Sequence, residues 1–359
     1  MRLTSIAAGI LTLAVAGYPA LNATRSHAAG RPGAVSQGRG PMSNPGRPTD
    51  GSGNEQQGDE QQQAPPLSSQ GTLNVQTTVV NVFATVRDKH NAIVSDLNQS
   101  DFKVYEDGVE QKVAYFTKEV DMPITLGVLM DTSGSMYRIM DAEQDAAARF
   151  IREVMRKKDE AMVISFDTDV NLLADFTEDV RELDHAIHQA QVNVDASGIG
   201  GTGGTVPSQG GGTNLYDAVY LACHDQLASE AGRKAVILLT DAEDTGSKLS
   251  MEDAVAAAQH ADAVIHVILI QDYGATEGYG PGVAMRMTGD TGGRVINVRN
   301  EKDLEKAFDV IMEELRSQYV LGYYPANATR DGTFRKIKVE VARPDVKILA
   351  RKGYYAPLR

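Results

Sequence analysis

Short apolar runs alternate with amphipathic stretches through the middle of the chain. The runs have the length of buried strands and lie at Ile124–Met130, Ala161–Phe166, Ala235–Thr240 and Ala263–Ile270. Between them, apolar residues recur at helical spacing in Asp141–Arg156, Leu215–Ala228, Met251–Ala261 and Glu301–Ser317. This alternation predicts an α/β fold with a doubly wound, mostly parallel sheet and helices on both faces.

The two flanks of this region show apolar and polar residues that alternate one by one, as in strands. Before it stand VVNVFATVRD and DFKVYEDGVEQKVAYF, the latter with an Asp107-Gly108 turn; after it stand RSQYVLGYYP, RKIKVEV and VKILARKGYY. Neither flank has enough strands to close a sandwich comfortably alone. We therefore predict one smaller β-sandwich-like module in which the α/β domain is inserted. Two unrelated small sheets are the alternative.

The first 71 residues carry neither pattern. A basic Met1-Arg2 start, the apolar Ile6–Ala16 run and an Ala-rich stretch indicate a secretory signal peptide, with an uncleaved signal anchor as the alternative. The next segment is rich in Gly, Pro, Ser and Gln, which is typical of a disordered linker. The predicted organisation is signal peptide 1–29, linker 30–71, β-module 72–121, α/β domain 122–317 and β-module 318–359.

Composition narrows the class of partner. The formal net charge of the 359 residues is −13, and no basic stripe is present, which argues against a nucleic-acid partner. A protein or peptide partner is expected instead. No later apolar run is long enough to span a membrane, so the mature chain should have no transmembrane span. Cys223 is the only cysteine, which excludes an intrachain disulfide.

One candidate site follows from the ends of the predicted strands. The stretch VLMDTSGSM ends an apolar strand with Asp131, Ser133 and Ser135, whose side chains offer only oxygen atoms. Oxygen ligands suit a hard cation such as Mg²⁺ or Ca²⁺. Asp241 also follows a predicted strand, and ligands of open α/β sheets bind outside the carboxyl ends of the strands. The two acids are therefore candidates for one site.

Three motifs together resemble the von Willebrand factor type A domain with its metal-ion-dependent adhesion site. They are DTSGSM after the first strand, GGGTNLYDA before a helix and LLTDAED after a later strand. The resemblance implies Asp131, Ser133, Ser135, Thr213 and Asp241 as metal ligands. It also implies Mg²⁺, Mn²⁺ or Ca²⁺ as the ion, and a partner that offers an exposed carboxylate. The flanking blocks VYEDGVEQKVAYF and YVLGYYP resemble secreted, VWFA-related proteins of acidobacteria.

The five oxygen groups are too few for an octahedral Mg²⁺ shell, so water should complete it and leave an exchangeable position. Tyr137-Arg138-Ile139 follows the first motif where integrin β subunits carry further acids, which puts an adjacent second ion in doubt. The alternative to a metal site is that Ser133 and Thr213 only cap helices and Asp131 closes a turn.

The sequence argues against two other kinds of site, a phosphatase centre and a zinc site. An aspartyl phosphatase would need Asp where Ser133 stands, so no enzymatic activity is expected. His185 and His188 are spaced for Zn²⁺ on a helix but lack a third ligand with suitable spacing. The sequence therefore predicts a secreted or periplasmic, non-enzymatic, metal-dependent protein-binding protein. The alternative is a structural or assembly protein in which the metal only stabilises the domain.

Overall fold

The computed structural model describes residues 79–119, 122–192, 212–270 and 279–358. By their contacts, these residues belong to one structural unit. The predicted signal peptide (1–29) and linker (30–71) lie outside the described residues.

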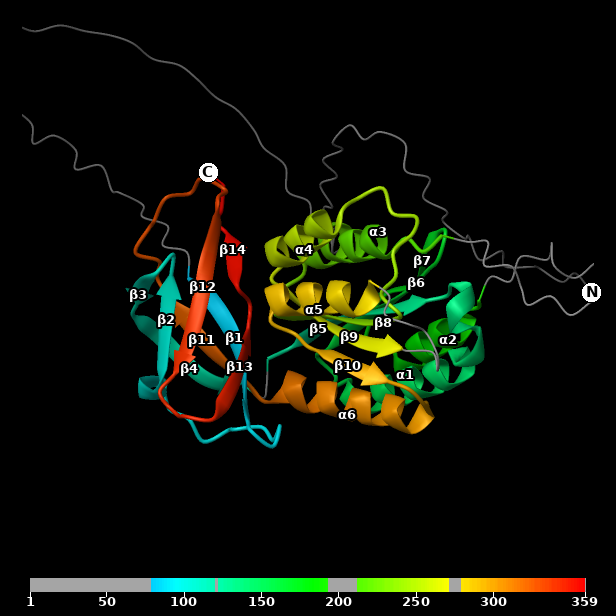
Figure 1. Cartoon of the computed structure of the whole chain (residues 1–359), viewed down its shortest axis with the longest axis horizontal. Helices are drawn as coiled ribbons and strands as arrows, with labels where there is room; N and C mark the ends of the chain where they lie inside the picture. The colour runs from blue at the N-terminus through cyan, green and yellow to red at the C-terminus, as the bar shows by residue number, and fades with distance from the viewer. Residues whose placement is uncertain (1–78, 120–121, 193–211, 271–278, 359) are drawn as a thin grey trace, which may run out of the picture. The chain divides into compact units, whose positions relative to one another are not determined.

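Strands from both flanks of the chain pair with each other in two four-stranded sheets (Figure 1). The strand orders are β13-β1-β11-β4 and β14-β12-β2-β3. The strands are β1 (Val80–Asp88), β2 (Phe102–Glu106), β3 (Val109–Gln111), β4 (Val113–Glu119), β11 (Gln318–Tyr323), β12 (Phe334–Val341), β13 (Val346–Ala350) and β14 (Gly353–Tyr355). Because β11 lies between β1 and β4, the first sheet needs both flanks, and the predicted insertion of one fold in the other is confirmed.

The core of the β-module follows from the alternation along its strands. Val82 of β1 and Leu321 of β11 are opposite each other in the first sheet and are fully buried. They share one apolar cluster with Val104 of β2 and Val339 of β12, which belong to the second sheet. Burial alternates along β2 and β12, and their buried side chains share one interior with those of β1 and β11, as in a sandwich.

The segment VKILARKGYY is not one strand, as the sequence predicted, but two. β13 pairs with β1 in the first sheet, whereas β14 pairs with β12 in the second. Arg351 and Lys352 carry the chain from one sheet to the other. Gly353 is required at the start of β14, because a Cβ there would lie 2.2 Å from the Phe334 ring and 2.5 Å from the Arg335 carbonyl oxygen. Single-residue alternation alone does not reveal such a change of sheet.

The inserted domain is built on a six-stranded sheet of order β10-β9-β8-β5-β6-β7. Its strands are β5 (Ile124–Asp131), β6 (Glu160–Phe166), β7 (Val170–Thr177), β8 (Arg233–Thr240), β9 (Ala263–Ile270) and β10 (Val295–Val298). All neighbours are parallel except β6 and β7, which are antiparallel. The predicted mostly parallel sheet is confirmed.

Helices cover both faces of this sheet (Figure 1). Val128 packs with the helices on one face, and the next residue, Leu129, packs with those on the other, as the alternation of a strand requires. The first face carries α1 (Met140–Val154), α2 (Val180–Gln189) and α6 (Glu301–Arg316), and the second carries α3 (Leu215–Tyr220), α4 (Met251–His260) and α5 (Gly280–Thr291). In the described part of the chain, none of the helices is long and apolar enough to cross a membrane.

Three elements were not indicated by the sequence patterns: β7, β10 and α5. β7 is a partly exposed edge strand, β10 has only 4 residues, and α5 contains poor helix formers such as Gly282 and Gly289. The helix predicted at Leu215–Ala228 begins as α3 but continues as a π-helix over Leu221–Gln226. The hydrophobic pattern thus located long, strongly periodic elements and missed short or weakly periodic ones.

A buried ionic cluster joins the β-module to the last helix of the α/β domain. Arg87 Nε of β1 donates to Glu314 Oε1 of α6 at 2.8 Å, and both side chains are buried. Arg294 Nε also lies 2.8 Å from Glu314 Oε1, although without the direction of a hydrogen bond. Since α6 leads directly into β11, this cluster ties the end of the inserted domain to the module that surrounds it.

Candidate metal site

The first motif is held by hydrogen bonds at the carboxyl end of β5. Asp131 is the last residue of the strand and is fully buried. Its Oδ1 accepts a hydrogen bond of 2.9 Å from the Ser133 backbone N–H, and its Oδ2 accepts one of 2.5 Å from the Thr240 hydroxyl at the end of β8. The Ser133 and Ser135 hydroxyls lie 3.0 Å apart. Hydrogen bonds therefore fix the first loop to the neighbouring strand β8.

The loop that carries Thr213 is bound to the loop that follows β8. The Thr213 N–H donates to Thr245 Oγ1 at 2.9 Å, and the N–H groups of Thr245 and Gly246 donate to the Thr213 carbonyl, each at 3.1 Å. On its other side, the Asn214 N–H donates to the carbonyl of Asp167 at 2.7 Å. Among the described residues, the Thr213 hydroxyl has no hydrogen-bond partner.

Asp241 directly follows β8 and is half-buried. Its Oδ1 accepts from the Glu243 N–H at 3.0 Å. The start of α5 packs closely on it, since a Cβ on Gly280 would lie 2.1 Å from the Asp241 carbonyl oxygen. Asp241 and Ser135 line the same pocket. Four predicted residues therefore share one edge of the sheet, and Thr213 stands on the adjoining loop without a hydrogen bond to them.

The electrostatics of this edge disfavour ionised acids in the absence of a cation. Burial, and secondly the charge of Asp241, raise the pKa of Asp131 to about 7, although hydrogen bonds from Ser133 and Thr240 act in the opposite direction. In the part of the chain that the structure describes, neither aspartate forms an ion pair with Lys, Arg or His. A positive charge placed here would therefore be strongly favoured.

Sequence reasoning missed a third acid at this edge, Glu143 of α1. It is fully buried, and neither of its carboxyl oxygens has a hydrogen-bond partner. Burial, then the charges of Asp131 and Asp241, raise its pKa well above the usual value. A signal was present in the sequence, because Glu143 lies on the helix face of Met140, Ala147, Phe150, Ile151 and Val154, which is otherwise apolar.

The donor set fits a hard divalent cation. It offers the carboxylates of Asp131 and Asp241, two seryl hydroxyls, and a threonyl hydroxyl without a hydrogen-bond partner among the described residues. Among the described residues, no three His, Cys, Asp or Glu side chains are grouped as a metal site. A cation held here would thus need the hydroxyls and water beside Asp131 and Asp241, which is typical of Mg²⁺ rather than of Zn²⁺. His185 and His188 of α2 are exposed, and both bond within their own helix.

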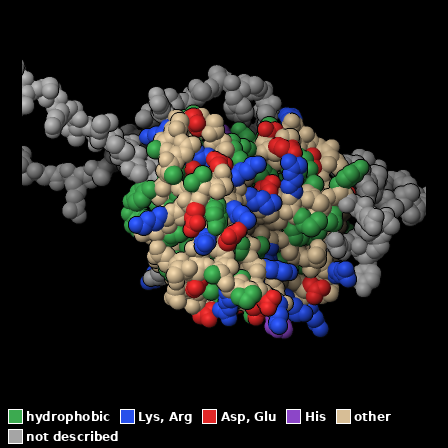
Figure 2. Space-filling view, turned by 60° about the vertical axis from the view of Figure 1, so that its left-hand side comes forward, with side chains coloured by type: hydrophobic (Ala, Val, Ile, Leu, Met, Phe, Trp, Pro, Cys, Tyr) green, Lys and Arg blue, Asp and Glu red, His purple; other side chains and the backbone are tan. Residues whose placement is uncertain are grey.

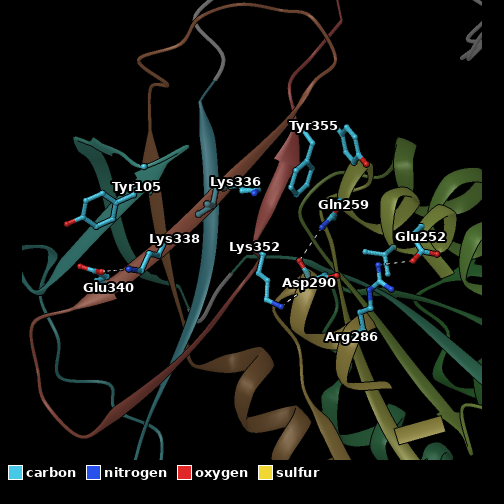
Figure 3. Close-up of a pocket in the computed structure, with 14 residues that line it drawn as sticks. Tyr105, Glu252, Gln259, Arg286, Asp290, Lys336, Lys338, Glu340, Lys352 and Tyr355 are labelled. Carbon is cyan, nitrogen blue, oxygen red and sulfur yellow. Dashed lines mark hydrogen bonds and ion pairs between the residues drawn. The ribbon is translucent and has the colours of Figure 1, made fainter. Parts of the chain in front are cut away.

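Of two surface pockets, only one is lined by proposed metal ligands. The larger, of about 850 Å³, lies between the β-module and helices α4 and α5. Figure 3 shows that its charges are mostly satisfied, with Lys338–Glu340 at 2.7 Å, Lys352–Asp290 at 2.9 Å and Arg286–Glu252 at 2.8 Å. The second, of about 610 Å³, is lined by Ser135 and Asp241. We therefore consider the smaller pocket the better candidate for a binding site, and we call it the edge pocket.

Charge on the surface is mixed rather than segregated on the face shown in Figure 2, where basic and acidic side chains are interspersed. Such a face offers no single-sign stripe for a phosphate backbone.

Comparison with known protein families gives a match for the middle of the chain. Residues 126–243 match the family model of the von Willebrand factor type A domain. No curated protein matches the chain.

Solved structures are similar only at low identity. A mutant of the PilB minor pilin from Streptococcus sanguinis is 16% identical over 55% of this chain and 62% of its own, with a TM-score of 0.41. The proximal thread matrix protein 1 of the mussel byssus, with a zinc-occupied MIDAS motif, is 13% identical over 57% of this chain and 48% of its own (TM-score 0.45). A von Willebrand factor type A protein from Catenulispora acidiphila is 11% identical over 77% of this chain and 74% of its own (TM-score 0.39).

At these identities and TM-scores, no ligand or partner is carried over from the solved structures. The family match does not depend on these structures. The matched residues run from β5, which ends in Asp131, through β8 to the loop that contains Asp241. This chain therefore contains a von Willebrand factor type A domain.

Proposed function

We propose that this protein is a secreted or periplasmic, non-enzymatic binding protein that captures a carboxylate of a protein or peptide partner through a divalent cation. The residues that would hold the cation are Asp131, Ser133, Ser135, Thr213 and Asp241. The observation that carries the proposal is a set of acids and hydroxyls beside an open pocket, in which neither Asp131 nor Asp241 forms an ion pair with Lys, Arg or His of the described residues. The predicted signal peptide supports the location.

The chain's own residues define what such a site could do. The hydrogen bonds of Asp131 with Ser133 and Thr240 fix its carboxylate, so the site is organised before the cation binds. Ser135 is exposed and faces the edge pocket, which leaves the solvent side open to a partner. A bound Mg²⁺, Mn²⁺ or Ca²⁺ would supply positive charge and an exchangeable position for an incoming carboxylate.

A structural role of the metal is the second candidate. It is favoured by the way in which the Thr213 loop and the loop after β8 are already bonded to each other. In that case the cation would stabilise the domain without contacting a partner, and the β-module would mediate assembly.

Calorimetric titration with Mg²⁺ tests the metal site. We expect Asp131→Ala to abolish binding while the fold is retained, because it removes a carboxylate at the centre of the donor set. Thr213→Ala should retain more Mg²⁺ affinity but lose more partner affinity, if its hydroxyl contacts the cation mainly in the partner-bound form. Unchanged Mg²⁺ affinity in Asp131→Ala would rule out the assignment.

Partner capture needs a separate measurement with a defined probe. We suggest fluorescence anisotropy of a labelled glycine-rich peptide with a single Glu, in Mg²⁺ and in EDTA, and a matched peptide with Gln. The proposal expects binding only for the Glu peptide and only in Mg²⁺. Mg²⁺ binding without any recognition of the Glu peptide would support the structural role instead.

A further inference from the structure

The edge pocket carries basic side chains beside the proposed metal ligands. Arg138, Arg299 and Lys302 line it together with Ser135 and Asp241. All three cations are exposed, and in the described residues none forms an ion pair or hydrogen bond through its side chain. This is unlike the larger pocket, where most charges are paired within the chain.

The position of each cation follows from the fold. Arg138 ends the 3₁₀-helix η2 (Gly134–Arg138), in which residues three apart lie on the same side, so it is on the side of Ser135. Arg299 directly follows β10, at the same carboxyl edge of the sheet as Asp131. Lys302 is in the first turn of α6. Three separate elements therefore bring positive charge to the rim of one pocket.

The N-terminus of α6 adds to this positive field. The Asn300 side chain caps the helix by accepting from the Asp303 N–H, so the N–H groups of the first two residues remain without a helical partner. A helix of 16 residues also carries partial positive charge at this end. Glu301 is the one acid besides Asp241 among the pocket-lining residues that the structure describes, so the rim keeps an excess of positive charge in a chain of net charge −13.

We propose that the edge pocket selects a partner segment with at least two acidic side chains. One carboxylate would reach the cation, and a second would lie against Arg138 and Arg299. This inference rests on the proposed function, since it names the class of partner for the same site. Exposed guanidinium groups without partners bind carboxylates well, and they steer acidic ligands toward a site.

The test compares labelled glycine-rich peptides that carry either one Glu or two Glu at separations of one to four residues. In Mg²⁺, we expect at least one two-Glu peptide to bind about 3- to 10-fold more tightly than the single-Glu peptide, as for partly exposed charge pairs. The double variant Arg138→Gln/Arg299→Gln should lose this gain. The gain is the ratio of the two-Glu affinity to the single-Glu affinity in the same variant, so an effect of the two arginines on Mg²⁺ binding or on electrostatic steering acts on both peptides.

A matched control removes two arginines elsewhere. Arg286→Gln/Arg343→Gln changes the net charge equally, at side chains that are about half exposed and lie outside the edge pocket. This variant should keep the full gain, which separates a local contact from the effect of total charge. The gain should also decrease as salt concentration rises, since exposed pairs are screened.

The outcomes distinguish the two proposals. If the single-Glu peptide binds in Mg²⁺ but no second Glu improves binding, or if the gain persists in Arg138→Gln/Arg299→Gln, the inference is overturned and the proposed function stands. If only a phosphoserine in the second position improves binding, the second group is not a carboxylate and the inference is also overturned. If no peptide binds in Mg²⁺, both proposals fail.

Discussion

Two of the regions that bury carboxyl groups treat them in opposite ways. At the junction of the modules, Glu314 lies against Arg87 and Arg294. At the carboxyl edge of the sheet, Asp131 and Glu143 are equally buried, but no Lys, Arg or His of the described residues pairs with either. The two regions therefore differ in whether a cationic side chain lies beside the acid, and not in how deeply the acid is buried.

The β-module repeats the first arrangement. Glu106 of β2 lies 3.3 Å from Arg335 of β12 and accepts hydrogen bonds from the Tyr323 and Tyr354 hydroxyls at 2.7 and 3.0 Å. Where a buried acid holds two elements together, this chain therefore provides its own donors. A buried acid without a cationic partner among the described residues, beside hydroxyls and an open pocket, fits a site for a cation from solution.

The largest effect is expected at the junction. Glu314→Ala would leave the buried Arg87 and the partly buried Arg294 without their buried counter-charge, and we expect the free energy of unfolding to fall by about 3–5 kcal/mol in urea denaturation. Glu313→Ala is the matched control, because Glu313 is 54% exposed and only 3.4 Å from Arg87. Its effect should stay below about 1 kcal/mol. Equal effects of the two substitutions would show that burial of the pair contributes nothing.

A bound divalent cation should stabilise the protein through the carboxyl edge of the sheet, and not through the ionic cluster around Glu314. With free Mg²⁺ at about 100 times its dissociation constant, the native state should gain about 2.7 kcal/mol, which is measured as a shift of the urea midpoint. Asp131→Asn should lose this gain, whereas Asp309→Asn, at an exposed position of α6, should keep it. A gain of the same size in Asp131→Asn would place the cation elsewhere.

Most of the fold could be predicted because its signals are local and repeated. The strands β5, β6, β8 and β9 are long apolar runs, and their order along the chain fixes a parallel sheet. The change of sheet between β13 and β14 could not be predicted, because it depends on the packing of Gly353 against Phe334, a contact between residues on neighbouring strands. The alternation of apolar and polar residues shows which face of a sheet a residue occupies, but it does not show to which sheet its strand belongs.

The candidate site was predicted to the extent that its motifs are contiguous. Asp131, Ser133 and Ser135 stand within five residues, so their spacing alone draws attention. Glu143 lies on another element, and only the helix geometry shows that it faces inward at the same edge. The cations of the edge pocket were missed for a similar reason, because Arg138 and Arg299 come together only when the sheet forms.

Glu143 gives a smaller and more specific effect. Burial, then the charges of Asp131 and Asp241, raise the pKa of Glu143 and so favour its neutral form, which Gln resembles; Glu143→Gln should therefore change the stability without added metal by less than about 1 kcal/mol. Mg²⁺ affinity should fall about tenfold, or about 1.4 kcal/mol, because a neutral amide cannot ionise to compensate the cation. Calorimetry would compare it with Glu153→Gln, an exposed position of the same helix. Unaltered Mg²⁺ affinity would remove Glu143 from the site.

The last prediction concerns the histidine that the junction keeps neutral. His266 of β9 is buried, and its Nδ1 lies 3.7 Å from Glu314 Oε2. Burial, then the charges of Arg294 and Arg87, lower its pKa to about 3, so this contact is not an ion pair at neutral pH. The arginines that stabilise a carboxylate thus disfavour a third cation beside it.

The sign of the pH dependence follows from this lowered pKa. In the unfolded chain His266 takes up a proton near pH 6.5, whereas in the folded protein it does so only near pH 3. Between these values the unfolded state binds more protons, so stability falls as the pH falls, by at most about 1.4 kcal/mol per pH unit. Urea denaturation between pH 7 and about pH 5 should therefore show a steeper loss in the wild type than in His266→Gln. His188→Gln, at an exposed position, should retain the wild-type slope. The same dependence of stability on pH in all three proteins would mean that the cluster around Glu314 tolerates a charged histidine. The electrostatic contrast drawn between this cluster and the carboxyl edge of the sheet would then be wrong.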